Sequence, residues 1–281
     1  MGRAVARLMP TDGWLKHGDV RLHYLDWGNP TLPAALFLHG GSAHAHWWDF
    51  TLPLLADRFH CIALDLRGHG DSSRPADGNY ALAAHADDVC AAIDALGLTR
   101  PALIGHSFGG FVAMVVAGRM GEALAALAIV DSRANIGVRS ARMLEALRKL
   151  PHPRWPDRSE AMARFRLLPA ATVAPAAVLA HVAAYGLQEA ADGTWTLKFD
   201  RRALAGAPAQ DLASHLIAAR CPILAVRAAH SDIVDVEALA EFRAAVPAVE
   251  LAEIADAHHH VMLDQPATLA RVLAEFLERH C

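Results

Sequence analysis

Short apolar runs recur along the chain, and most of them end in glycine or polar residues. Two extended runs at 13–16 and 20–28 are joined by a His-Gly-Asp turn, which predicts a β-hairpin. Largely apolar runs follow at 34–40, 60–70, 101–107, 124–132 and 222–228, with a more polar one at 249–255. Runs of this length predict β-strands, and the most apolar of them predict buried ones.

Helical patterns separate most of these runs, at 47–58, 81–97, 108–120 and 266–280. Apolar strands that alternate with amphipathic helices predict an α/β fold, in which a mostly parallel twisted sheet carries helices on both faces. Ligands bind such sheets at the carboxyl ends of the strands. The loops that follow the strands are therefore the expected place for reactive or ligand-binding residues.

One region breaks the alternation. Residues 133–215 lack strong buried strands but contain helical patterns at 139–150, 158–168 and 174–187 and a polar extended run at 193–200. We predict a helical cap inserted at 133–215 into a core domain formed by residues 1–132 and 216–281.

Composition narrows the classes of function. The chain has 281 residues, 54% of them apolar, and a formal charge of −4, with no cluster of basic residues. This argues against nucleic acid as a partner. No apolar run is long enough for a membrane span or a secretory leader. The four scattered cysteines suggest a reduced, cytoplasmic protein, whose oligomeric state the sequence does not indicate.

Ser107 is the residue most suggestive of chemistry. It lies in the stretch GHSFGG (105–110), between a predicted strand and a predicted helix. A Gly-x-Ser-x-Gly motif in this context forms a sharp turn that exposes the serine hydroxyl. Gly105 and Gly109 would leave room where side chains would collide, and the N-terminus of the helix would favour a developing anion.

A serine hydroxyl needs a base, and the base needs an orienting acid. The base could come from His258 to His260, which follow the last strand; as consecutive side chains diverge, we expect no metal at this run. The acid could come from Asp232, Asp235 or Asp131, each of which follows a strand. The glycines of LHGGS (38–42) could supply backbone N–H groups to an oxyanion.

Five stretches in this order resemble the α/β-hydrolase family: LHGGSAHAHWW (38–48), DLRGHGDSSRP (65–75), GHSFGG (105–110), VRAAHSD (226–232) and HHHVMLDQP (258–266). The resemblance implies Ser107 as nucleophile, Asp232 as acid and His259 as base. His258, which replaces the family's usual glycine, is the alternative base. The backbone N–H groups of Gly41 and Phe108 would form the oxyanion hole, or that of Ser42 if the loop is shifted by one residue.

The resemblance also implies an activity that needs no metal or organic cofactor. Family members that open epoxides or remove halides typically carry aspartate as nucleophile, whereas serine favours acyl transfer. We expect a hydrolase of a carboxylic ester, thioester or lactone with a small, largely apolar substrate, which Trp47, His106 and Phe111 would contact.

Three alternatives stay open. The same residues would serve a carbon–carbon bond hydrolase of ring-cleavage diketo acids, or a cofactor-free perhydrolase, also called a haloperoxidase. A ligand-binding receptor could also keep the fold without turnover.

Overall fold

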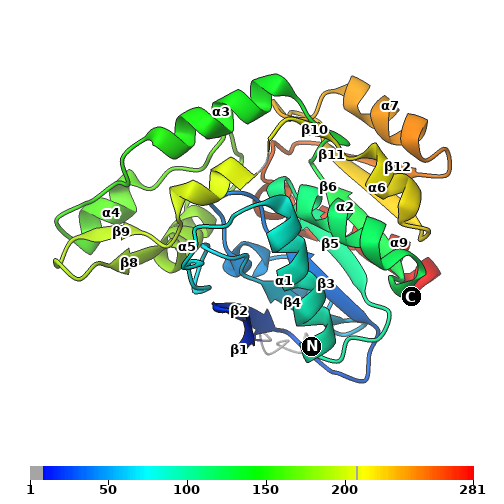
Figure 1. Cartoon of the computed structure of the whole chain (residues 1–281), viewed down its shortest axis with the longest axis horizontal. Coiled ribbons are helices and arrows are strands. Elements are labelled where there is room, and N and C mark those ends of the chain that lie inside the picture. The colour runs from blue at the N-terminus through cyan, green and yellow to red at the C-terminus, as the bar shows by residue number, and fades with distance from the viewer. Residues whose placement is uncertain (1–8, 207) are drawn as a thin grey trace, which may run out of the picture.

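A twisted eight-stranded sheet forms the centre of the computed structural model, which describes residues 9–206 and 208–281 (Figure 1). The strand order is β1-β2-β4-β3-β5-β6-β11-β12; β1 and β2 pair antiparallel with each other and β2 with β4, and the other pairs are parallel. The strands are β1 (Thr11–His17), β2 (Val20–Asp26), β3 (Ala34–Leu38), β4 (His60–Leu64), β5 (Ala102–His106), β6 (Ala126–Val130), β11 (Ile223–Ala228) and β12 (Glu250–Ile254). The predicted hairpin and all six predicted later strands are confirmed.

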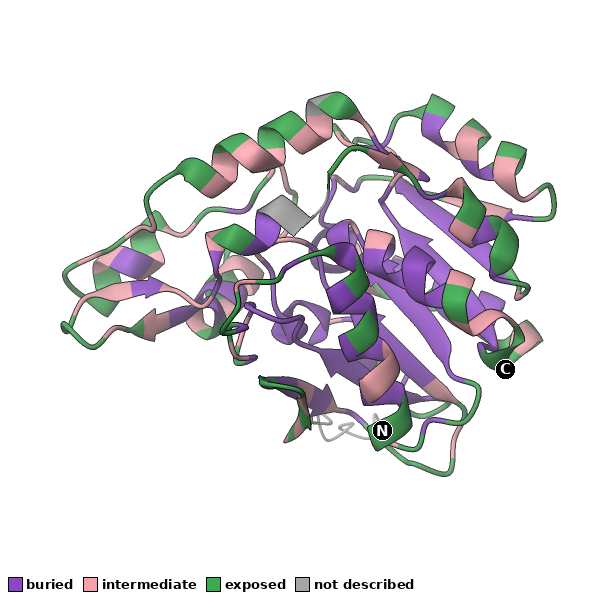
Figure 2. Cartoon of the chain, in the orientation of Figure 1, coloured by how far each residue is buried: buried purple, intermediate pink, exposed green. Residues whose placement is uncertain are grey.

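Helices cover both faces of the sheet because the buried strands are apolar on both sides. Leu36 and Leu38 of β3 pack on one face, and Ala35 and Phe37 on the other. The first face carries α1 (Leu82–Ala95), α2 (Phe108–Met120), which η3 (Gly121–Ala123) follows, α6 (Ala213–Ala218) and α7 (Val236–Ala245). The second carries η1 (Ala45–Trp48), η2 (Leu52–Leu54), α8 (Val261–Asp264) and α9 (Pro266–His280). Figure 2 shows the central strands buried between these layers.

Two helix predictions differ from the structure. The run 47–58 forms no α-helix but consists of turns and parts of the short 3₁₀ helices η1 and η2. Pro53, at the start of η2, has no N–H for an α-helical hydrogen bond. Helices α6, α7 and α8 have no counterpart among the predicted helices. No helix among the described residues is long and apolar enough to cross a membrane.

The chain leaves the sheet between β6 and β11. It forms β7 (Asn135–Ile136), α3 (Val138–Lys149), α4 (Arg158–Arg164), α5 (Ala176–Gly186), β8 (Leu187–Glu189), β9 (Trp195–Leu197), η4 (Arg201–Gly206) and β10 (Gln210–Asp211) before α6. The predicted limit at 215 falls inside α6, which lies against α2: a Cβ built on Gly118 would be 2.8 Å from the Cα of His215. The role of 133–215 as a cap stays a prediction.

The turn between β5 and α2 depends on glycine. Ser107 has φ 50° and ψ −117°, in the left-handed half of conformational space that non-glycine residues rarely occupy. A Cβ on Gly105 would lie 2.3 Å from the carbonyl oxygen of Gly109, and one on Gly109 would lie 2.5 Å from that of His39. These are backbone atoms that cannot move independently, so the predicted need for glycine at both positions is confirmed.

We therefore expect Gly109→Ala to destabilise the protein by about 1–3 kcal/mol or more, although alanine is the better helix former. Gly137→Ala is the matched control, because a Cβ there would meet only one atom, 4.0 Å away, and it should cost less than about 1 kcal/mol. Urea unfolding of both variants measures the difference. Equal stabilities would contradict the account of the turn.

Candidate active site

Three side chains from separate segments form one line of hydrogen bonds. The Nδ1 of His259 lies 2.7 Å from the Oδ2 of Asp131, and its Nε2 lies 2.9 Å from the Oγ of Ser107. Because a carboxylate can only accept, Nδ1 carries the proton and Nε2 presents its lone pair to the serine hydroxyl. The arrangement can therefore remove the proton of Ser107.

Asp131, and not Asp232, holds the histidine, so the predicted acid is corrected. Asp131 directly follows β6, the neighbour of the strand that leads to Ser107, and its φ of 44° marks the sharp turn there. It is fully buried, whereas Asp232 lies four residues beyond the end of β11 and is exposed. Asp235, the other candidate, caps α7 through the backbone N–H of Ala238.

The loop after β11 supports Asp131 with donors instead of supplying the acid. Ser231 Oγ donates to Oδ2 of Asp131 over 2.6 Å, and the backbone N–H of Ala228 donates to Oδ1 over 2.8 Å. Together with His259, three donors fix the position of this buried carboxylate. A buried carboxylate without such partners would carry a large desolvation cost.

The other histidines near His259 donate hydrogen bonds to backbone carbonyl groups and not to Ser107. His258 donates through Nδ1 to the carbonyl of His230, and His260 donates through Nε2 to the carbonyl of Pro169. The choice of His259 over His258 as the residue facing Ser107 thus agrees with the geometry. His106 donates through Nε2 to the carbonyl of His259 itself, over 2.8 Å.

Burial keeps two of these neighbours uncharged at neutral pH. It lowers the pKa of His260 to about 3, and it holds the pKa of His106 well below the usual value for histidine. A positive charge that develops on His259 would therefore not face a second positive charge on His106 or His260. The surroundings of His259 are suited to a base that gains a proton during the reaction.

Backbone N–H groups lie beside Ser107. A Cβ built on Gly41 would lie 3.7 Å from the Cβ of Phe108, so the two predicted oxyanion residues are neighbours. Neither backbone N–H donates to another described residue. Phe108 is also the first residue of α2, where the helix dipole favours negative charge. The fallback residue, Ser42, has φ 60° and donates its hydroxyl to the carbonyl of Gly41.

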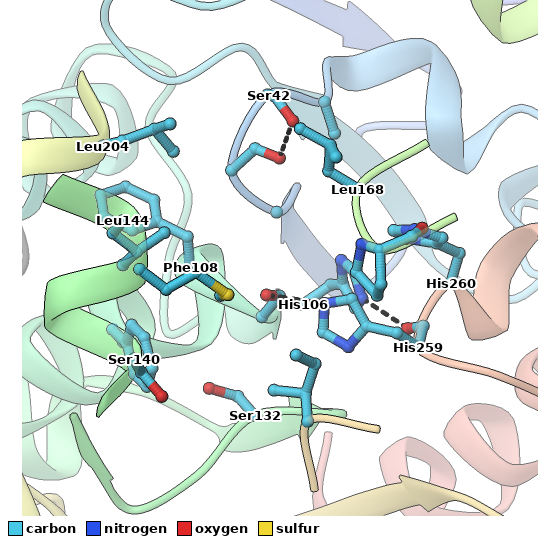
Figure 3. Close-up of a pocket in the computed structure, with 18 of the residues that line it drawn as sticks. Ser42, His106, Phe108, Ser132, Ser140, Leu144, Leu168, Leu204, His259 and His260 are labelled. Carbon is cyan, nitrogen blue, oxygen red and sulfur yellow. Dashed lines mark hydrogen bonds between the residues drawn. The ribbon is translucent and has the colours of Figure 1, made fainter. Parts of the chain in front are cut away.

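A cavity of about 260 Å³ opens onto these groups. The predicted substrate contacts Trp47, His106 and Phe111 all line it. Figure 3 shows Leu144, Leu204 and Phe108 across the cavity from the histidines. The sequence predicts that the inserted region adds leucines to the pocket but does not indicate which residues, because those that line the cavity are widely spaced: Met143, Leu144, Leu147, Leu168, Pro169 and Leu204.

Curated relatives match part of the chain. A protein named epoxide hydrolase 1 from Caenorhabditis elegans is 35% identical over 107 residues, which are 36% of this chain and 26% of that protein. A fluoroacetate dehalogenase from a Burkholderia species is 35% identical over 118 residues, 41% of this chain and 38% of that protein. The matches therefore span well under half of either relative.

Similarity in three dimensions extends over nearly the whole chain. The crystal structure of E-2-(acetamidomethylene)succinate hydrolase is similar with a TM-score of 0.83 and 24% identity, over 96% of this chain and 99% of that one. A family model described as the α/β-hydrolase fold matches residues 33–266. The chain therefore belongs to the α/β-hydrolase family.

Proposed function

We propose that the protein cleaves a carboxylic ester of a small, largely apolar substrate through an acyl-enzyme on Ser107. The observation that carries this proposal is the line of hydrogen bonds from Ser107 through His259 to Asp131. It joins a nucleophile, a base and an orienting carboxylate in the geometry of acyl transfer.

The first half of the reaction forms the acyl-enzyme. Ser107 Oγ attacks the ester carbonyl carbon while its proton passes to Nε2 of His259. The carbonyl oxygen becomes an oxyanion that the N–H groups of Phe108 and Gly41 stabilise. His259 then gives the proton to the leaving alcohol as the ester C–O bond breaks.

The second half returns the free enzyme. Water gives a proton to Nε2 of His259 and attacks the acyl carbon, and Ser107 Oγ leaves and takes that proton back. The products are a carboxylic acid and an alcohol. Asp131 does not exchange a proton in either half; it holds the tautomer of His259 and stabilises the imidazolium.

The nucleophile separates this chain from the relatives named for epoxides and fluoroacetate. Family members with those activities typically use aspartate, and this chain has Ser107 at that position. A hydroxyl oxygen paired with a base suits attack on a carbonyl carbon. The apolar residues across the cavity, such as Leu144 and Leu204, suit an acyl group of short or medium length.

The choice of acid gives a direct test. We expect Asp131→Asn to lower kcat on an activated ester by about 10³–10⁴-fold, because an amide favours the wrong tautomer of His259. Asp232→Asn, the matched control on an exposed residue, should stay within about twofold of wild type. Steady-state kinetics of both variants, with circular dichroism to check folding, measures this. The reverse ranking would restore Asp232 as the acid.

The bond that is cleaved is tested with p-nitrophenyl esters of increasing acyl length, using wild type and Ser107→Ala side by side. We expect turnover that requires Ser107 and falls for long chains, because the cavity holds only about 260 Å³. If the folded wild-type protein hydrolyses none of these esters but cleaves a vinylogous diketo acid, it is a carbon–carbon bond hydrolase. Peracid formation with peroxide, without ester cleavage, would indicate a perhydrolase.

A further inference from the structure

Two histidines and an aspartate gather outside the active-site line of hydrogen bonds. His46 belongs to η1 and Asp49 directly follows it, whereas His181 comes from α5 in the inserted region. His46 Nδ1 lies 2.9 Å and His181 Nε2 lies 2.7 Å from the same oxygen, Oδ2 of Asp49. The three potential ligand atoms all lie within 4.8 Å of one another.

Asp49 has a second carboxylate oxygen that could accept a hydrogen bond or bind an ion, and no neighbouring described residue contacts it with a donor. The residue is only 8% exposed, and its second oxygen, Oδ1, is buried without a hydrogen-bond partner among the described residues. Buried carboxylate oxygens normally have a partner, so an unpaired one calls for an explanation such as an ion. His46 is held in place by Tyr185, whose ring stacks on it with the centroids 3.6 Å apart.

We propose that His46, Asp49 and His181 bind a divalent transition-metal ion of the Zn²⁺ type. Two imidazole nitrogens and a carboxylate are ligands that Zn²⁺, Co²⁺ and Ni²⁺ accept. Ligand atoms about 2.0–2.2 Å from a tetrahedral ion lie roughly 3.4 Å apart. The nitrogens of His46 and His181 lie 2.9 and 2.7 Å from Oδ2 of Asp49, so a small rotation of these side chains would open the site to the ion. On binding, the proton on Nδ1 of His46 and the proton on Nε2 of His181 move through solvent to the other nitrogen of each neutral ring. Each imidazole then presents a lone pair to the ion, and the two metal bonds replace both hydrogen bonds.

Two other groups of potential ligands are less suited. One contains His259, which is already engaged by Ser107 and Asp131. The other contains Asp65, whose oxygens accept hydrogen bonds from His23 and from the backbone of Ala45 and Asp71. Only at Asp49 does a buried carboxylate oxygen stay unpaired within the described chain.

The ion would join two parts of the fold. Its ligands connect the loop around η1, which packs on the sheet, with α5 of the inserted region. Trp47, which lines the active-site cavity, lies between the ligands His46 and Asp49 in the chain. We assign the ion a stabilising role that tethers α5, and no part in the cleavage by Ser107.

The test uses the full chain without a histidine tag, stripped of metal by a chelator and then titrated with Zn²⁺ in a calorimeter. We expect one strong site in the wild type and in His260→Gln. In His181→Gln the affinity should fall about tenfold or more. Glutamine can keep a hydrogen bond to Asp49 but replaces the imidazole ligand, and His260→Gln removes a histidine from the competing group around His259.

Thermal melting with and without Zn²⁺ gives a second readout, independent of ester cleavage. Zn²⁺ should raise Tm of the wild type and of His260→Gln by the same amount, and Tm of His181→Gln by clearly less at the same Zn²⁺ concentration. Asp49→Asn should match His181→Gln, which keeps the test informative if one variant folds poorly. The proposal is overturned if His181→Gln binds Zn²⁺ as tightly as wild type, or if only His260→Gln loses binding.

Discussion

The reversal of the chain at Ser107 is the constraint on which the site depends. The strained backbone there, with φ 50°, places the hydroxyl above the carboxyl end of β5 and starts α2 in the next residue. Gly105 and Gly109 allow that reversal because the backbone passes where their Cβ atoms would be. The same turn leaves the N–H of Phe108, next to Ser107 in the chain, without a partner among the residues that the structure describes. One local conformation thus supplies both the nucleophile and part of the anion site.

The neighbouring strand completes the arrangement. Asp131 directly follows β6 beside β5, and His259 lies in the loop after β12, so segments from three strand ends meet at one edge of the sheet. The donors to Asp131 fix the carboxylate that His259 contacts, and the low pKa of His260, about 3, leaves that neighbour uncharged. The fixed carboxylate holds the proton on Nδ1 of His259, so that Nε2 presents its lone pair to the hydroxyl of Ser107.

The sequence predicts most of the sheet, the nucleophile and the base, whereas it does not predict the structure of the run 47–58 or the identity of the acid, for physical reasons. Strands β3 and β5 are short and, except for His106 at the end of β5, apolar, so their pattern is unambiguous. The run 47–58 has the apolar spacing of a helix, but Pro53 prevents an α-helix from continuing through it. The acid was misassigned because Asp131 and Asp232 both follow parallel strands that end at the same edge. Sequence order does not tell which carboxylate turns inward; the backbone turn at Asp131 and the donors Ser231 and Ala228 decide it.

Covalent labelling tests the central claim, that Ser107 is a nucleophile activated by His259. The folded protein would be treated with a fluorophosphonate, digested and analysed by mass spectrometry to locate the adduct. The account predicts a single phosphonyl group on the peptide that contains Ser107, formed rapidly at neutral pH. A folded protein that stays unlabelled, or that carries the group on another residue, would contradict it and favour a member of the family that binds ligands without turnover.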